Sequence, residues 1–137
     1  MSSIAEAESE IIEEFELFDD WMDKYNYIIE LGKSLPLIDP QYKDDAHLIP
    51  GCQSQVWLHA EMNDGKLFFR ADSDAIITKG IINLLIRVLS GHTPQEILSS
   101  DLAYIDQIGI KEHLSPTRSN GLVSMIQQIR GYAQRNV

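Results

Sequence analysis

The residue with the clearest potential for chemistry is Cys52, the single cysteine among 137 residues. One sulfur excludes an internal disulfide, a Cys-x-x-Cys redox pair and a cysteine-rich zinc site, since each requires a second thiol. Two interpretations remain: a buried thiol that only packs, or a lone nucleophile. Pro50 and Gly51 before the thiol and the polar residues 53–55 after it are typical of a turn, whereas a packed cysteine more often lies in an apolar run. The surroundings therefore shift the balance toward a reactive thiol.

Four segments of the chain resemble the SufE family, the sulfur-accepting partners of cysteine desulfurases. Gly-Cys-Gln-Ser-Gln-Val-Trp at 51–57 looks like the family's active-site segment. The stretch DSDAIITKG at 72–80 resembles its strand-to-helix junction, and HLSPTRSNGL at 113–122 resembles its pattern before the last helix. A fourth match is YIIELG at 27–32. The similarity covers nearly the whole chain in the expected order.

The resemblance implies a persulfide carrier that is not itself an enzyme. Cys52 would hold the persulfide intermediate, and the protein would activate a SufS-like cysteine desulfurase and pass the sulfur to a SufBCD-like iron–sulfur scaffold complex. Pyridoxal phosphate would belong to the desulfurase, so we expect no cofactor on this chain. The expected site comprises Cys52 with six supporting residues: Gly51, Gln53, Ser54, Asp74, His113 and Arg118.

Three of the supporting residues have two possible roles. Arg118 resembles the family's arginine near the active cysteine, where a cation favours the thiolate; in a polar loop it could equally hold a carboxylate or helix-end carbonyls. Asp74 is expected first as a helix cap and second as a contact that influences the cysteine loop. His113 is either a group near Cys52 or an ordinary polar loop residue.

The stretch 49–54 must both expose and protect a labile persulfide. We therefore expect Cys52 to alternate between a sheltered pocket and an outward position, with Gly51 supplying backbone freedom. Gln53 and Ser54 would orient the cysteine through hydrogen bonds or contact the partner. With no second cysteine, sulfur on Cys52 must leave to an external acceptor.

Two other functions fit a lone cysteine. A hydrolase would use Cys52 as nucleophile and a histidine as base, although no local histidine-plus-acid signature supports it. A binding module with a merely packed Cys52 would tolerate its replacement by serine. The four histidines lack metal-ligand spacing, so no metal site is expected.

The elements that position the cysteine follow from periodicity. Apolar residues spaced by three and four predict helices before residue 32, with Asp19 or Asp20 capping the second and Gly32 ending it. Alternation from Val56 onward and the Asp-Gly pair at 64–65 predict a hairpin, with a third strand at 46–49 that rests partly on the family pattern. Apolar helices follow. The expected fold class is α+β, a small three-stranded antiparallel sheet with helices packed against it, SufE/IscU-like.

Composition predicts one domain over 1–137, because a chain of this length that is 44% hydrophobic can bury its own core. The net charge is −10, with 13 acidic and 3 basic residues in 1–50 but 8 of each in 51–137. Without a basic footprint, nucleic acid is not an expected partner. No apolar run has membrane-spanning length and no signal peptide is evident, so we expect a cytoplasmic monomer or homodimer.

Overall fold

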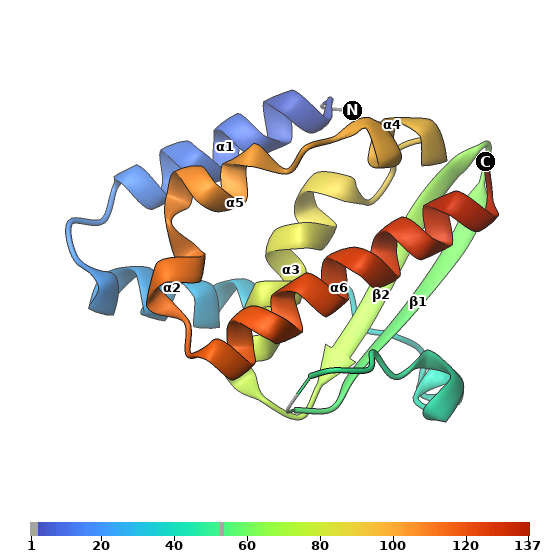
Figure 1. The fold of residues 1–137 in the computed structure, drawn as a ribbon, viewed down its shortest axis with the longest axis horizontal. Helices are drawn as coiled ribbons and strands as arrows, with labels where there is room; N and C mark the ends of the chain where they lie inside the picture. Colours follow the sequence, from blue (N-terminus) through green and yellow to red (C-terminus); the bar gives the residue numbers. More distant parts are fainter. Residues whose placement is uncertain (1–2, 53) are drawn as a thin grey trace.

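The computed structural model describes residues 3–52 and 54–137, and Figure 1 shows their arrangement. The described residues form a β-hairpin of two strands, β1 (Val56–Asn63) and β2 (Lys66–Ser73). The α-helices are α1 (Ile4–Glu16), α2 (Trp21–Lys33), α3 (Ile76–Leu89), α4 (Pro94–Ser99), α5 (Ala103–Ile108) and α6 (Pro116–Arg135). Short 3₁₀ turns are η1 (Pro40–Tyr42), η2 (Asp45–His47) and η3 (Ile110–His113).

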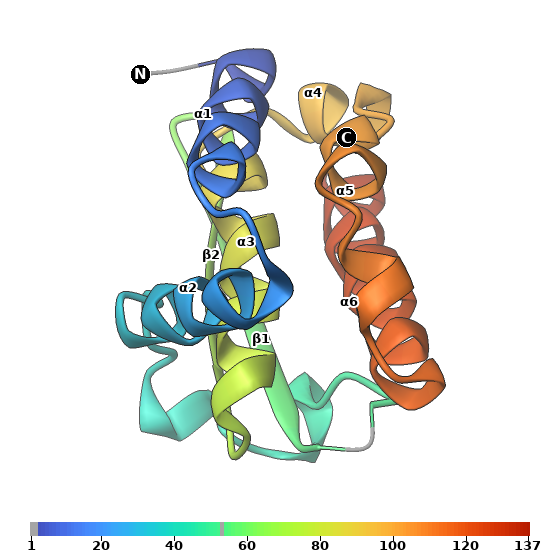
Figure 2. The same ribbon diagram turned by 90° about the vertical axis from the view of Figure 1, so that its left-hand side faces the viewer.

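Helix α3 lies at the centre and contacts α1, α2, α6 and β2 (Figures 1 and 2). Its sequence is apolar on almost every side, which fits a helix covered by other elements. The crossing with α2 is close: a Cβ on Gly80 would overlap the carbonyl oxygen of Ile28. The expectation that Gly32 ends α2 is wrong, because the helix continues to Lys33 and Gly32 lies buried at this crossing.

The hairpin has the predicted tight turn. Asp64 and Gly65 have φ values of 51° and 78°, as a two-residue type I′ turn requires. The strands pair from Val56 with Ser73 to Asn63 with Lys66. One face, including Val56, Leu58, Leu67 and Phe69, is buried in the core.

The predicted third strand at 46–49 is wrong. The Asp44 side chain accepts a hydrogen bond from the backbone N–H of His47 and caps η2, so part of this segment curls instead of extending. A single antiparallel bridge, Leu48 with Trp57, remains, and the Ile49 N–H donates to the Val56 carbonyl at 2.8 Å. The sheet of the described residues therefore has two strands, while the α+β class and the antiparallel pairing are confirmed.

Several helix caps agree with the sequence. Asp20 caps α2 by accepting from the Asp23 N–H at 2.9 Å, and Thr93 with Glu96 forms the expected capping box of α4.

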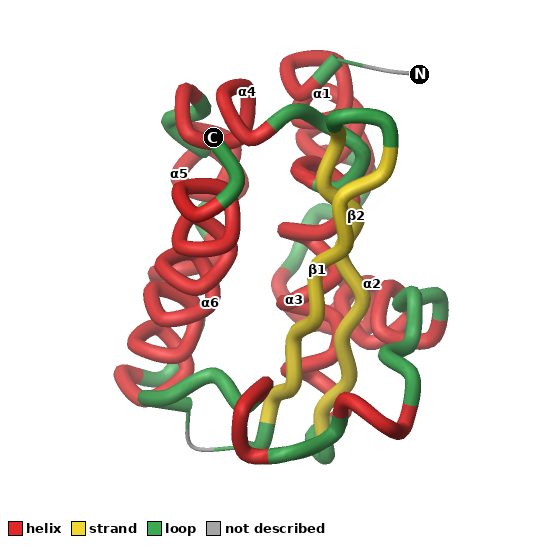
Figure 3. Tube along the Cα trace, turned by 90° about the vertical axis from the view of Figure 1, so that its right-hand side faces the viewer, coloured by secondary structure: helices red, strands yellow, loops and turns green. Residues whose placement is uncertain are grey.

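Helix α6 runs beside the hairpin (Figure 3), where the Tyr132 hydroxyl donates to the Leu58 carbonyl at 3.1 Å. Across the described residues, no helix combines the length and apolar character needed to cross a membrane.

Candidate functional site

Cys52 follows a turn in the connection between Leu48, which forms a bridge with Trp57, and the start of β1. Gly51 has φ +84°, a left-handed conformation that other residues adopt only at a cost. This positive φ sets the direction in which the chain turns as it reaches Cys52. We call residues 49–52 the cysteine loop. Its first residue is tied to β1 by the Ile49–Val56 hydrogen bond.

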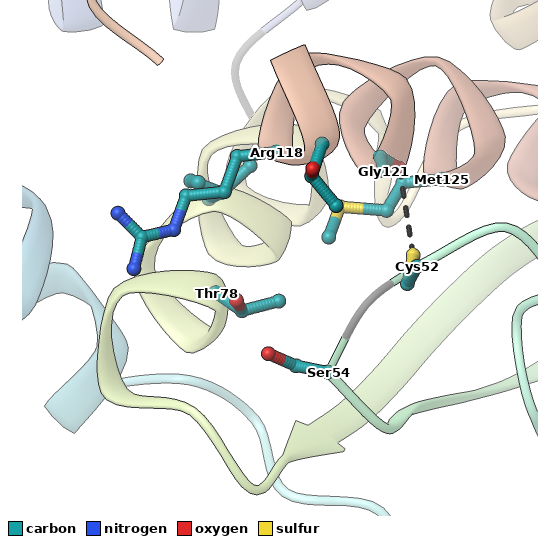
Figure 4. Close-up of a pocket in the computed structure, with 8 residues that line it drawn as sticks. Cys52, Ser54, Thr78, Arg118, Gly121 and Met125 are labelled. Carbon is teal, nitrogen blue, oxygen red and sulfur yellow. Dashed lines mark hydrogen bonds between the residues drawn. The ribbon is translucent and has the colours of Figure 1, made fainter. Parts of the chain in front are cut away.

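The Cys52 side chain is half-buried against α6. Its Sγ–H donates to the Gly121 carbonyl with an Sγ···O distance of 3.7 Å (Figure 4). A Cβ on Gly121 would lie 3.4 Å from that sulfur, so the thiol packs where the helix carries no side chain. Burial raises the pKa of the Cys52 thiol, which keeps the sheltered sulfur protonated and weakly nucleophilic.

A small cavity of about 60 Å³ lies on the inner side of Cys52. Helices α3 and α6 form its walls, and Figure 4 shows Ser54 and Thr78 on the side facing α6. Its lining combines hydroxyls with apolar side chains and one guanidinium: Cys52, Ser54, Thr78, Ile81, Thr117, Arg118, Gly121 and Met125.

A second, wide and more open hollow of about 570 Å³, which we call the outer hollow, lies beside the cysteine loop. It is lined by the loop, by Asp45 and Leu48 at η2, by Ser54 and Gln55 just before β1, and by Gln128 of α6. Cys52 lines both spaces. A small displacement of this one side chain therefore exchanges a sheltered environment for an open one.

Asp74 holds the chain just beyond the cysteine loop. Its Oδ1 accepts from the Gln55 N–H at 3.1 Å, and its own N–H donates to the Gln55 carbonyl at 3.3 Å. The Ser73 hydroxyl donates to the same carbonyl at 2.7 Å. The expectation that Asp74 is the N-cap of α3 is wrong, because Ala75 occupies that position and no side chain caps the helix. The contact with the residues after Cys52 was the second role considered for Asp74.

Arg118 lies in the first turn of α6, so its expected place in a polar loop is wrong. The Ser115 hydroxyl accepts from the Arg118 N–H and caps the helix, with Pro116 at its first position. The Arg118 side chain borders the inner cavity, but in Figure 4 it extends away from Cys52. Burial alone accounts for the direction of the thiol pKa shift in this position. A role of Arg118 toward the thiolate therefore stays a prediction.

His113 does not border either space beside Cys52. Its ring stacks on Trp21 with centroids 3.8 Å apart, and its carbonyl accepts from the Tyr25 hydroxyl at 2.7 Å. His47 and His59 lie on the hairpin's outer side, 3.3 Å apart between ring nitrogens. No histidine among the described residues lines the Cys52 cavity, so the geometry offers no base for the hydrolase alternative.

The structure brings together four of the expected site residues, Gly51, Cys52, Ser54 and Arg118, with Asp74 one hydrogen bond away through Gln55. Gln53 lies outside the described residues. Sequence reasoning missed Thr78 and Gly121 as cavity residues. A glycine inside a helical pattern indicates close packing, so Gly121 carried a usable signal, whereas nothing local marked Thr78.

Residues 9–133 match the SufE family, described as an Fe-S metabolism associated domain. An uncharacterized SufE-like protein of Rhizobium meliloti (strain 1021) is 41% identical over 130 residues, covering 91% of this chain and 93% of that protein. A second uncharacterized SufE-like protein, from Rhizobium etli, is 39% identical over 130 residues, covering 91% of this chain and 88% of its own length.

The fold has a counterpart among solved structures. The solution structure of a hypothetical protein from Thermus thermophilus superposes with a TM-score of 0.78 over 95% of both chains, at 19% identity. That likeness concerns the fold alone. The family match over most of the sequence, together with the identity to the two relatives along nearly their full length, shows that this chain belongs to the SufE family.

Proposed function

We propose that Cys52 accepts sulfur from the persulfide of a SufS-like, pyridoxal-phosphate-dependent cysteine desulfurase and delivers it to a SufBCD-like iron–sulfur scaffold. Membership of the SufE family supports an accessory role in Fe–S metabolism and implies a desulfurase partner. The observation that carries the proposal is the position of the single thiol beside both a small, more enclosed inner cavity and a wide, more open outer hollow. The cofactor that releases sulfur from cysteine would remain with the desulfurase.

The transfer is a thiol–persulfide exchange. The Cys52 thiolate attacks the outer sulfur of the donor's Cys–S–S–H group and forms a new Sγ–S bond. The donor S–S bond breaks, and its electron pair leaves with the donor cysteine as a thiolate. No external oxidant or reductant is consumed. Because the donor thiol is free again, removal of its sulfur permits the next turnover, which accounts for stimulation of the desulfurase.

The resting position of Cys52 favours protection over attack. Burial raises the thiol pKa, so few sheltered molecules hold a thiolate at neutral pH. Movement into the outer hollow restores water around the sulfur and returns the pKa toward its ordinary value. A desulfurase that binds the cysteine loop in its outward position would therefore activate the nucleophile by the same contact that brings the two sulfurs together.

The inner cavity suits storage of the outer sulfur. A water molecule needs roughly 10–15 Å³ of such space, and the cavity of about 60 Å³ leaves room for one additional atom beside Cys52. Hydroxyls of Ser54, Thr78 and Thr117 border it, as does the side chain of Arg118. These donors would stabilise a persulfide that has lost its proton, because nearby positive charge and hydrogen bonds favour the anionic form.

The test is non-reducing intact-mass spectrometry after incubation with a cysteine desulfurase and cysteine. We expect wild type to gain the mass of one sulfur atom and to accelerate the desulfurase, and Cys52→Ser to do neither. Both proteins should have the same circular dichroism spectrum, since serine occupies nearly the same space. Absence of added sulfur with several desulfurases, from a protein whose thiol still reacts with iodoacetamide, would refute the proposal.

A further inference from the structure

Gly121 occupies a position in α6 where glycine is unfavourable. It is buried and lies well inside a helix of 20 residues, where glycine loses more conformational freedom than any other residue. The three atoms nearest to a Cβ built on Gly121 all belong to Cys52: Sγ at 3.4 Å, and Cα and Cβ at 3.9 Å. Cys52 therefore packs directly on this position, at ordinary contact distance from the place where a Cβ would stand.

The next turn of the same helix makes a second close contact with the cysteine loop. A Cβ on Gly51 would lie 2.6 Å from the Ser124 hydroxyl oxygen. A side chain at Gly51 would force the Ser124 hydroxyl to rotate away and would be strained by the positive φ. Two successive loop residues therefore lie against α6: Gly51 against Ser124, and Cys52 against Gly121. Each of these contacts includes one glycine. The sheltered position of Cys52 depends on this close approach.

We propose that Gly121 is a positioning residue: the lack of side-chain bulk beyond a Cβ at this place sets the balance between the sheltered and outward positions of Cys52, an inference that rests on the proposed carrier function. A methyl group at this place makes an ordinary contact with the sulfur, so alanine should preserve the sheltered position. The branches of valine extend into the volume that Cys52 occupies. Valine should therefore displace Cys52 toward the outer hollow.

The environments on the two sides of Cys52 predict how its reactivity changes. On the inner side the charged lining residue is Arg118 of α6, and on the outer side it is Asp45 of η2. The buried position raises the thiol pKa, and exposure to water removes that effect. A displaced Cys52 should therefore react faster at neutral pH, with its reactivity profile moved toward lower pH.

The experiment measures the alkylation rate of Cys52 by iodoacetamide as a function of pH, without any desulfurase. We expect Gly121→Val to react about tenfold faster than wild type or more, because overfilling a packed contact shifts a two-state balance by that order. Gly121→Ala should stay close to wild type. The matched control is Gly131→Val on the same helix, where the nearest group to a Cβ is the Arg135 guanidinium at 3.5 Å. Equal rates for Gly121→Val and wild type would overturn the inference.

Thermal unfolding separates displacement of Cys52 from general damage. If Gly121→Val lowers the melting temperature, adding Cys52→Gly should recover most of the loss, because it removes the side chain that valine strikes. No recovery in the double variant would overturn the positioning role, since valine would then collide with other residues.

A desulfurase arm keeps this inference distinct from the carrier function. The persulfide formed on Gly121→Val should be lost to dithiothreitol faster than that on wild type or Gly131→Val. Faster alkylation without sulfur uptake by any variant would refute the carrier function and leave the positioning of the thiol intact. Sulfur uptake by wild type together with unchanged alkylation of Gly121→Val would refute only the role of Gly121.

Discussion

Replacement of Asp74 by alanine should loosen the chain next to Cys52 without disturbing the core. The substitution removes the carboxylate oxygen that accepts from the Gln55 N–H at 3.1 Å. It leaves the Ser73 hydroxyl on the Gln55 carbonyl at 2.7 Å, so one side of the anchor remains. Asp74 lies at the surface, where water replaces a lost partner at modest cost. The predicted change therefore concerns local opening more than global unfolding.

The magnitude follows from the single hydrogen bond that is lost. Such a bond contributes about 1 kcal/mol net, since its charged acceptor strengthens it and its exposure weakens it. One kcal/mol corresponds to a factor of about 5 in an equilibrium constant. Opening of the anchor should thus become about fivefold more frequent, and the free energy of global unfolding should fall by no more than about 1 kcal/mol.

Amide hydrogen exchange and Cys52 alkylation are the two assays. We expect the Gln55 amide to exchange about fivefold faster in Asp74→Ala, with Leu58 in the buried part of β1 unchanged. Iodoacetamide should also react faster with Cys52. Asp74→Asn, which keeps an oxygen acceptor, should recover much of the wild-type behaviour. Asp19→Ala is the charge-matched control, because it removes one exposed carboxylate far along the chain.

Two results would refute this reasoning. Wild-type exchange at Gln55 in Asp74→Ala would mean that the carboxylate does not anchor this amide. A large loss of global stability with no local change at Gln55 or Cys52 would mean that Asp74 serves the start of α3 instead. The second result would restore the capping role first expected from the sequence.

Gly80→Ala should destabilise the protein by about 3 kcal/mol or more in chemical denaturation, because the new methyl overlaps the backbone of Ile28 and overpacking is costly. The control Gly131→Ala should be neutral or stabilising. Equal stabilities of Gly80→Ala and wild type would contradict the close α2–α3 crossing. Burial raises the Cys52 pKa, so the unfolded chain loses its thiol proton at lower pH than the folded protein, and stability should fall as pH rises through the ordinary thiol pKa. This decline should level off above the raised pKa and be absent from Cys52→Ser, although the buried Tyr104 and the half-buried Tyr132 affect both proteins alike. Stability curves that run parallel against pH for wild type and Cys52→Ser would argue against a buried thiol. Arg118→Ala should leave iodoacetamide reactivity of the resting thiol unchanged but shorten the persulfide lifetime, with Arg118→Lys intermediate; a changed resting thiol reactivity would place the guanidinium nearer Cys52 than the structure does.

Elements with local signals were predictable from the sequence. The Asp64–Gly65 pair specifies a tight turn because both positions need positive φ, and the hairpin forms there. Thr93, Pro94 and Glu96 lie within one turn of each other and form the predicted cap. Helix α6 also begins at such a signal, Ser115 followed by Pro116, which the interpretation of this stretch as a loop overlooked.

The errors arose where local and distant partners compete. The stretch 46–49 could extend, but the Asp44 side chain stabilises a 3₁₀ turn that includes residues 46 and 47 and leaves a single bridge. Asp74 could cap α3, but Gln55, far along the chain, takes its carboxylate. Cys52 and Gly121 are separated by 69 positions, and the packing of one against the other depends on the docking of α6. Propensity and spacing carry no information about such pairs.

The anchors of the cysteine loop explain how one thiol can be both protected and available. The Ile49–Val56 hydrogen bond fixes the chain before Cys52, and the contacts of Gln55 with Ser73 and Asp74 fix it afterwards. Movement of Cys52 between these anchors leaves the hairpin pairing intact, so it does not require partial unfolding. What holds the sulfur inward is then mainly its packing on α6. Under the proposed function, a partner that competes for that packing would act on reactivity directly, because the sulfur would leave the environment that raises its pKa when it leaves the helix.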